Sequence, residues 1–154
     1  MSVLNPNESF AKGILGVPVK RSTATVAADQ DLFSVEGGAV LLTGFLGRVT
    51  TAIGAGSQDL ELDFDPDDGG SNVALSTLVL VDAAPIGQLF TLNTTAGGAL
   101  VSTLDVAYNV KLATPILLGQ AGDIVLDVTG TEAGSVEWFA WYVPVDPGAV
   151  MVAV

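Results

Sequence analysis

Apolar and polar residues alternate most regularly between residues 59 and 65. Leu60, Leu62 and Phe64 alternate there with four carboxylates, Asp59, Glu61, Asp63 and Asp65. Successive side chains of a strand point to opposite faces, so this period of two predicts a strand that buries one face. The following run, Asp65-Pro-Asp-Asp-Gly-Gly70, combines the residue types that favour a tight turn.

The stretch 39–53 is apolar on both faces, which predicts a strand buried on both sides. Strict alternation places Val40, Leu42 and Leu46 on one face and Leu41, Phe45, Val49 and Ile53 on the other. Gly44 and Gly47 interrupt the stretch and indicate a bulge or a bend.

Similar patterns recur along the chain and predict roughly nine or ten strands in total. The further segments are 32–35, 74–81, 88–92, 104–110, 116–118, 124–128 and 136–143. We therefore expect an all-β fold, a single-domain antiparallel β-sandwich or barrel of jelly-roll type with an extended N-terminal arm.

The two ends differ from this body, which spans residues 23–147. Residues 1–22 contain Pro6, Gly13, Gly16 and Pro18 and are expected to form an extended docking arm. Residues 148–154 form a wholly apolar tail. A free apolar β-prone end invites aggregation, so we expect Val150, Met151 and Val152 to be buried, within the domain or against another subunit.

Composition excludes several classes of function. The chain of 154 residues has 49% hydrophobic and 14% charged residues and a mean hydropathy of +0.56, which favours an assembly that hides surface. It has no Cys and no His, so thiolate catalysis, Cys-type zinc sites and the usual general base are absent. A net charge of −12 argues against nucleic acid as a partner.

The longest charge-free run, 83–104, is interrupted by Pro85 and several polar residues, so we expect no membrane partner. Charge is unevenly distributed: residues 1–22 carry +2 and residues 23–154 carry −14. A slightly basic arm on an acidic body predicts docking onto another surface. The residues expected to make that contact are Phe10, Lys12, Ile14, Leu15, Lys20 and Arg21.

The acidic run raises one metal hypothesis. Asp63, Asp65 and Asp67 place three oxygen ligands at alternate positions, as Ca²⁺ prefers. The EF-hand pattern is incomplete, because Asp68 replaces its glycine and Ala74 its final glutamate. The alternative is a solvated strand face, and we expect no metal and no other cofactor.

No set of nucleophile, base and orienting residue can be named, so we do not expect an enzyme. Paired carboxylates alone could hydrolyse a glycosidic bond, but sugar sites usually add stacking aromatic rings. Trp138 and Trp141 are three residues apart on one predicted strand and should point to opposite faces.

The segment Phe33-Ser-Val-Glu-Gly-Gly-Ala-Val-Leu-Leu-Thr-Gly-Phe-Leu-Gly-Arg-Val-Thr-Thr-Ala-Ile53 resembles small structural proteins of tailed bacteriophages. They share F-x-V-x-G-G-x-V-L-[LI]-T-x-[LF]-x-G-x-V-T-T-x-I, then a leucine-alternating strand and a Gly-Gly turn, here Leu60-Glu-Leu62 and Gly69-Gly70. The resemblance covers about residues 32–93.

This resemblance implies a virion protein without catalytic activity. Together with the arm, the β-rich body and the hydrophobic composition, it leads us to expect a capsid decoration (cement) protein on the capsid exterior. Its partners would be the major capsid protein and itself, as a homo-oligomer for which we expect a trimer. Two alternatives stay open: a tail, neck or fibre component, and a carbohydrate- or calcium-binding β-sandwich module.

Overall fold

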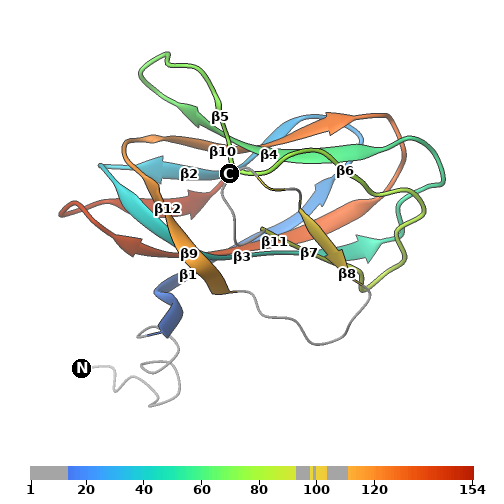
Figure 1. Ribbon diagram of the computed structural model, residues 1–154, viewed down its shortest axis with the longest axis horizontal. Coiled ribbons are helices and arrows are strands. Elements are labelled where there is room, and N and C mark those ends of the chain that lie inside the picture. The colour runs from blue at the N-terminus through green and yellow to red at the C-terminus, as the bar shows by residue number, and fades with distance from the viewer. Residues whose placement is uncertain (1–13, 93–97, 99, 104–110) are drawn as a thin grey trace.

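Two antiparallel sheets packed face to face form the fold, as the sequence predicts (Figure 1). The computed structural model describes residues 14–92, 98, 100–103 and 111–154. Sheet A contains β1 (Val17–Thr25), β3 (Val40–Thr51), β7 (Leu89–Thr91), β8 (Val101–Thr103), β9 (Lys111–Leu118) and β11 (Ser135–Pro144). Sheet B contains β2 (Gln30–Glu36), β4 (Asp59–Pro66), β5 (Val73–Ala74), β6 (Val79–Leu80), β10 (Gly122–Thr129) and β12 (Val150–Ala153).

Many successive strands alternate between the two sheets. Sheet A runs β1-β11-β3-β7-β8, with β9 also paired to β3, and sheet B runs β12-β2-β10-β4-β5, with β6 also paired to β4. Consecutive strands β1 to β4 therefore lie in alternate sheets, as do β9 to β12. Sheet B is the upper layer and sheet A the lower layer in Figure 1.

The period-two strand is confirmed as β4, in which Leu60, Leu62 and Phe64 are buried between the sheets. The long apolar stretch is β3, but its predicted faces are wrong beyond Leu42. A bulge next to Gly44 shifts the register, so Phe45 and Val49 join Leu42 in the core. A one-residue shift exchanges the faces of every later side chain, which moves Leu46 to the outer face.

Three other predicted segments turn out differently. The predicted strand 74–81 is instead divided between two short strands, β5 and β6, and between them the Leu62 N–H donates to Ser76 Oγ. Residues 104–110 lie outside the described residues. Residues 17–22, predicted as arm, form the start of β1, since Val17 and Val19 alternate with Pro18 and Lys20 along its pairing with β11.

Aromatic rings fill the centre of the sandwich. Trp138 of β11 is fully buried, with its ring centroid 5.5 Å from that of Phe45 and 6.3 Å from that of Phe90. Phe33 of sheet B contacts Phe45 edge to face at 6.1 Å, which joins the two layers. These rings pack between the two sheets and hold them together, which leaves the outer face of each sheet uncovered by the core.

Candidate functional site

Charge is segregated between the two sheets. All four cations within the described strands lie in sheet A, which carries one carboxylate, Glu137. The strands of sheet B, as far as the structure describes them, carry eight carboxylates and no cation. The cations are Lys20, Arg21, Arg48 and Lys111; the carboxylates of sheet B are Asp31, Glu36, Asp59, Glu61, Asp63, Asp65, Asp123 and Asp127.

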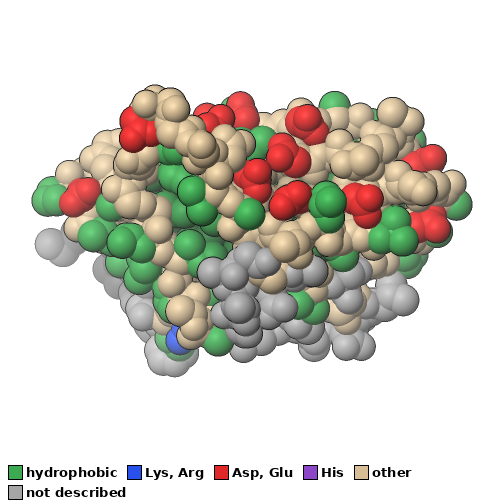
Figure 2. Space-filling view, turned by 45° about the horizontal axis from the view of Figure 1, so that its top comes forward, with side chains coloured by type: hydrophobic (Ala, Val, Ile, Leu, Met, Phe, Trp, Pro, Cys, Tyr) green, Lys and Arg blue, Asp and Glu red, His purple; other side chains and the backbone are tan. Residues whose placement is uncertain are grey.

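The register of β4 and β10 concentrates the acidic side chains on the outer face of sheet B. Asp127 pairs directly with Glu61, and Asp123 with Asp65. Figure 2, with the top turned forward, shows the carboxylates gathered over this layer. Like charges directly opposite each other destabilise a sheet, so this face is arranged for contact with water rather than for tight packing.

Two of these carboxyl groups titrate abnormally. Partial desolvation, followed by the charge of Asp63 and then of Asp127, raises the pKa of Glu61. Partial desolvation, followed by the charges of Asp63 and Asp29, raises the pKa of Asp127. The outer face of sheet B therefore binds protons more readily when folded than unfolded.

The predicted calcium ligands do not converge. Asp63 and Asp65 both lie on the outer face of β4, two residues apart. Asp67 follows in the turn, where its N–H donates to the Ala121 carbonyl. Over the described part of the chain, no three carboxylates are grouped so that they could hold a metal ion. Ca²⁺ needs at least six oxygen ligands, so the turn offers too few.

The outer face of sheet A carries an ion cluster that spans three strands. Glu137 of β11 accepts hydrogen bonds from Lys20 of β1 and Arg48 of β3. The Glu137 side chain is 9% exposed, whereas those of Lys20 and Arg48 are 52% and 53% exposed. The hydrogen bond from Lys20, reinforced by Arg48, lowers the pKa of Glu137 despite its desolvation.

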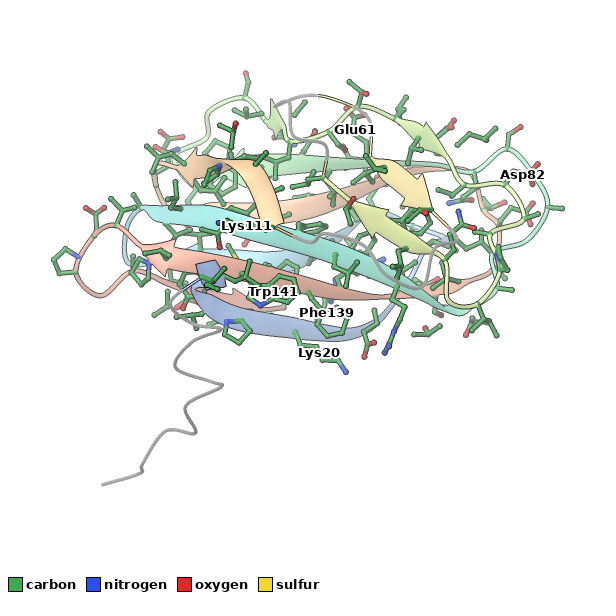
Figure 3. The ribbon with its side chains drawn as sticks, turned by 60° about the horizontal axis from the view of Figure 1, so that its bottom comes forward. Lys20, Glu61, Asp82, Lys111, Phe139 and Trp141 are labelled. Carbon is green, nitrogen blue, oxygen red and sulfur yellow. The ribbon has the colours of Figure 1, made fainter. Side chains whose placement is uncertain are left out.

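Two aromatic rings lie beside this cluster. Phe139 and Trp141 stack on the outer face with centroids 6.4 Å apart and planes inclined by 22°. Lys20 Nζ lies 5.4 Å from the Phe139 centroid, a cation–π distance. Figure 3 shows Lys20, Phe139 and Trp141 together on the face of sheet A that it turns forward.

The prediction that Trp138 and Trp141 point to opposite faces is confirmed, because Trp138 is in the core. The pair Phe139 and Trp141 was missed. Its signal was present, since residues two apart on a strand share a face.

The predicted arm contacts separate into three groups. Phe10 and Lys12 lie outside the described residues. Ile14 is exposed, and the Leu15 carbonyl accepts a hydrogen bond from Thr43 Oγ1, which ties the chain to β3. Lys20 and Arg21 belong to β1; Lys20 faces outward, whereas Arg21 Nη1 donates to the Asp31 carbonyl of sheet B.

The apolar tail forms β12, which pairs with β2 at the end of sheet B. Met151 is buried, whereas Val150 and Val152 are each 38% exposed. Within one copy, β12 therefore buries only alternate side chains.

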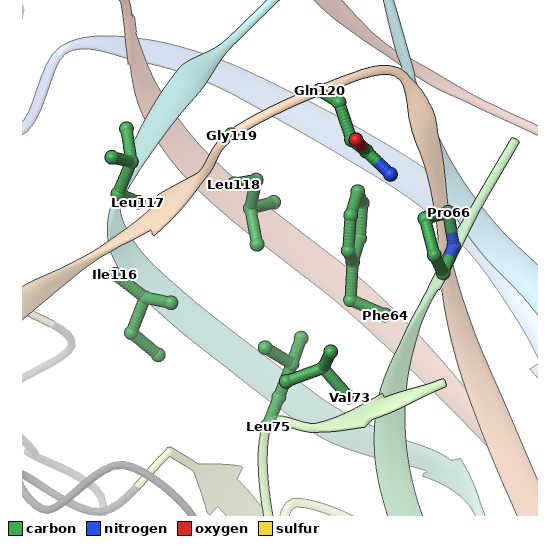
Figure 4. A pocket seen from close by; sticks show the side chains of 9 residues that line it. All are labelled: Phe64, Pro66, Val73, Leu75, Ile116, Leu117, Leu118, Gly119 and Gln120. Atoms are coloured by element: carbon green, nitrogen blue, oxygen red, sulfur yellow. The ribbon is translucent and has the colours of Figure 1, made fainter. Parts of the chain in front are cut away.

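An apolar groove lies at the opposite edge of the sandwich, between β5 and β9 (Figure 4). Its volume is about 270 Å³. Its lining contains no charged residue: Phe64, Pro66, Val73, Leu75, Ile116, Leu117, Leu118, Gly119 and Gln120. This volume lies just below the roughly 300–1,000 Å³ of typical ligand pockets.

Comparison with known proteins gives no relative: no protein-family model, curated protein or solved structure matches the chain. Among the residues that the structure describes, no helix is long and apolar enough to cross a membrane. Function must therefore be argued from the two outer faces and the two edges.

Proposed function

We propose that the chain is a structural subunit of a tailed-phage virion that decorates the capsid. In this proposal the outer face of sheet A, with the residues that precede β1, docks on the major capsid protein, and sheet B faces solvent. The observation that carries it is the segregation of charge between the two sheets. A subunit with one contact face and one acidic, water-facing side is suited to coat a larger particle.

The docking face has the residue types that dominate protein interfaces. Trp, Tyr and Arg are enriched among the residues that contribute most to binding, and here Trp141 and Arg48 lie on one face. Lys20 and Arg48 neutralise Glu137, so the face can be desolvated without leaving a carboxylate unpaired.

The strand order also supports a virion role. The order β1-β11-β3-β9 facing β2-β10-β4-β5 is that of a jelly roll. Viral capsid proteins and lectins use this architecture, which joins two Greek keys. Fold alone does not establish function, so the resemblance of residues 33–53 to phage structural proteins adds the second reason.

Binding to phage heads that lack the protein tests the proposal. Purified protein should co-sediment with such heads, and Trp141→Ala or Arg48→Glu should weaken binding at least about 30-fold, the loss expected for a central contact. Asp65→Asn, on the opposite sheet, is the matched control and should bind like the wild type. Binding to tail tubes alone, or equal losses from both faces, would contradict the proposal.

A second candidate, a carbohydrate-binding module, is favoured by one observation. Phe139 and Trp141 present stacked rings next to a carboxylate and two cations, the elements that recognise a sugar ring. Calorimetric titration with capsular and cell-wall oligosaccharides distinguishes the candidates. Saturable binding that Trp141→Ala abolishes would favour the module, and its absence would contradict it.

A further inference from the structure

Some of the large exposed apolar side chains lie at two opposite edges of the sandwich. The tail edge is defined by Val150, Val152 and Val154, on and beside β12. The groove edge is defined by Val73 of β5 and Leu117 of β9, which flank the groove. Because β12 and β5 end sheet B on opposite sides, one copy cannot bring the two edges together.

The tail edge is an open strand edge. β12 pairs with β2 on one side and ends sheet B, so within the described residues no strand pairs with its other side. Val150, Val152 and Val154 are exposed, and no charged side chain occurs between residues 147 and 154. Such an uncharged apolar edge is a template for pairing with another chain, and natural proteins usually protect it with charge or proline.

The groove edge has the complementary shape. Val73 is 57% and Leu117 60% exposed, and they stand at the rims of an apolar cavity. In the described structure β5 and β9 each pair with a strand on one side only. Figure 2 shows apolar side chains between the carboxylates of this region. A strand entering here would place every second side chain, about 7 Å apart, into the groove.

Charge decides which surfaces of two copies can meet. Copies with a net charge of −12 repel each other, most strongly through the acidic outer faces of sheet B. β12 and the groove lining carry no charged side chain, so their burial removes mainly apolar surface. Pairing β12 with a second β12 would instead leave both grooves uncovered.

We infer that the tail edge of one copy docks in the groove edge of the next copy. This inference rests on the proposed function, for which the sequence leads us to expect a homo-oligomer. The contact joins two different surfaces, so an open assembly keeps one tail edge and one groove edge free at its ends until a ring closes. Val150 and Val152 then supply the side chains that cover Val73 and Leu117.

Cysteine crosslinking without any capsid tests this contact separately from capsid binding. The chain has no native cysteine, so Val152→Cys and Leu117→Cys introduce the only thiols. A short bis-maleimide should join the double variant into species larger than a dimer, whereas each single variant should stay unlinked. Crosslinking of Val152→Cys alone would reveal a β12–β12 contact and overturn the inference, as would failure of the double variant to crosslink.

Solution mass supplies the second measurement. Val152→Lys and Leu117→Lys each place a charge in the contact and should reduce the mass to that of one 15.6 kDa chain. Ile86→Lys, at an exposed apolar residue that does not line the groove, is the control and should keep the wild-type mass. A wild type that is already monomeric, or Lys variants that retain its mass, would contradict the inference. Loss of capsid binding without loss of mass would refute only the decoration role.

Discussion

Gly47 has no room for a side chain because the indole ring of Trp138 lies across it. A Cβ atom built on Gly47 would lie 2.4 Å from Cζ3 and 2.7 Å from Cε3 of Trp138, well below the 3.0 Å that real contacts keep. Trp138 is fully buried between Phe45 and Phe90, so its ring cannot swing away freely. Gly47→Ala should therefore overpack the core.

The expected loss follows from two opposing terms. Forcing an additional methyl group into a packed core costs about 1–3 kcal/mol. Replacing a glycine stabilises by about 0.4–1 kcal/mol through the lower entropy of the unfolded chain. The difference between the mid-range values is about 1.3 kcal/mol, and we expect Gly47→Ala to lower the free energy of unfolding by about that amount in urea denaturation followed by tryptophan fluorescence.

Two variants make this test specific. Gly119→Ala is the matched control, since nothing lies within 4 Å of its added Cβ; only the gain of about 0.4–1 kcal/mol remains, so its stability should not fall below that of the wild type. Trp138→Phe shortens the ring that meets Gly47, so the double variant should be more stable than the two single losses predict. A Gly47→Ala protein as stable as Gly119→Ala, or strictly additive losses, would refute the packing argument.

Three further predictions concern charge. Asp127→Asn removes a like charge opposite Glu61 and should stabilise by about 0.5 kcal/mol at neutral pH and low ionic strength, a gain that 1 M salt removes in urea denaturation. Folding raises the pKa of Glu61 and of Asp127, so their charged forms destabilise the folded protein at neutral pH. This loss of stability fades as the pH falls through the folded pKa values towards the ordinary values of 4.5 and 3.8. A stability difference between the wild type and Asp127→Asn that stays constant with pH would contradict this. Folding lowers the pKa of Glu137, so Glu137→Gln should lower the free energy of unfolding by about 1 kcal/mol above pH 4.5 and by progressively less at lower pH. Urea denaturation over a series of acidic pH values measures this, and an equal loss at about pH 3 would argue against the ion cluster. If the acidic turn bound calcium, calcium at about 100 times its Kd would add about 2.7 kcal/mol of stability. We expect no rise in Tm by calorimetry when calcium is added. A rise in Tm that Asp63→Asn abolishes would show that the acidic turn binds calcium.

Local pattern was sufficient to predict elements whose burial alternates simply. Leu60, Leu62 and Phe64 predict β4 because a strand at a sandwich surface buries every second residue. The faces of β3 could not be predicted, because they depend on which residue the bulge beside Gly44 skips. Gly44 signalled the bulge, but only pairing with β11 fixes the register.

The site was predictable only in part, since it depends on strands distant in sequence. Residues 17–22 contain an alternating pattern, yet their assignment to β1 rests on pairing with β11, which is more than a hundred residues away. The cluster of Lys20, Glu137 and Arg48 arises from the same pairing. Charge segregation between the sheets likewise appears only when the strand order is known.

In the proposed function the outer face of sheet A docks on the capsid and the outer face of sheet B faces solvent. Hydroxyl-radical footprinting with mass spectrometry tests it directly, by comparing the free protein with the protein bound to phage heads. Phe139 and Trp141 should be protected on binding, whereas the labelling of Val125 on the outer face of sheet B should stay unchanged. Protection of Val125 with Phe139 and Trp141 still labelled would contradict it.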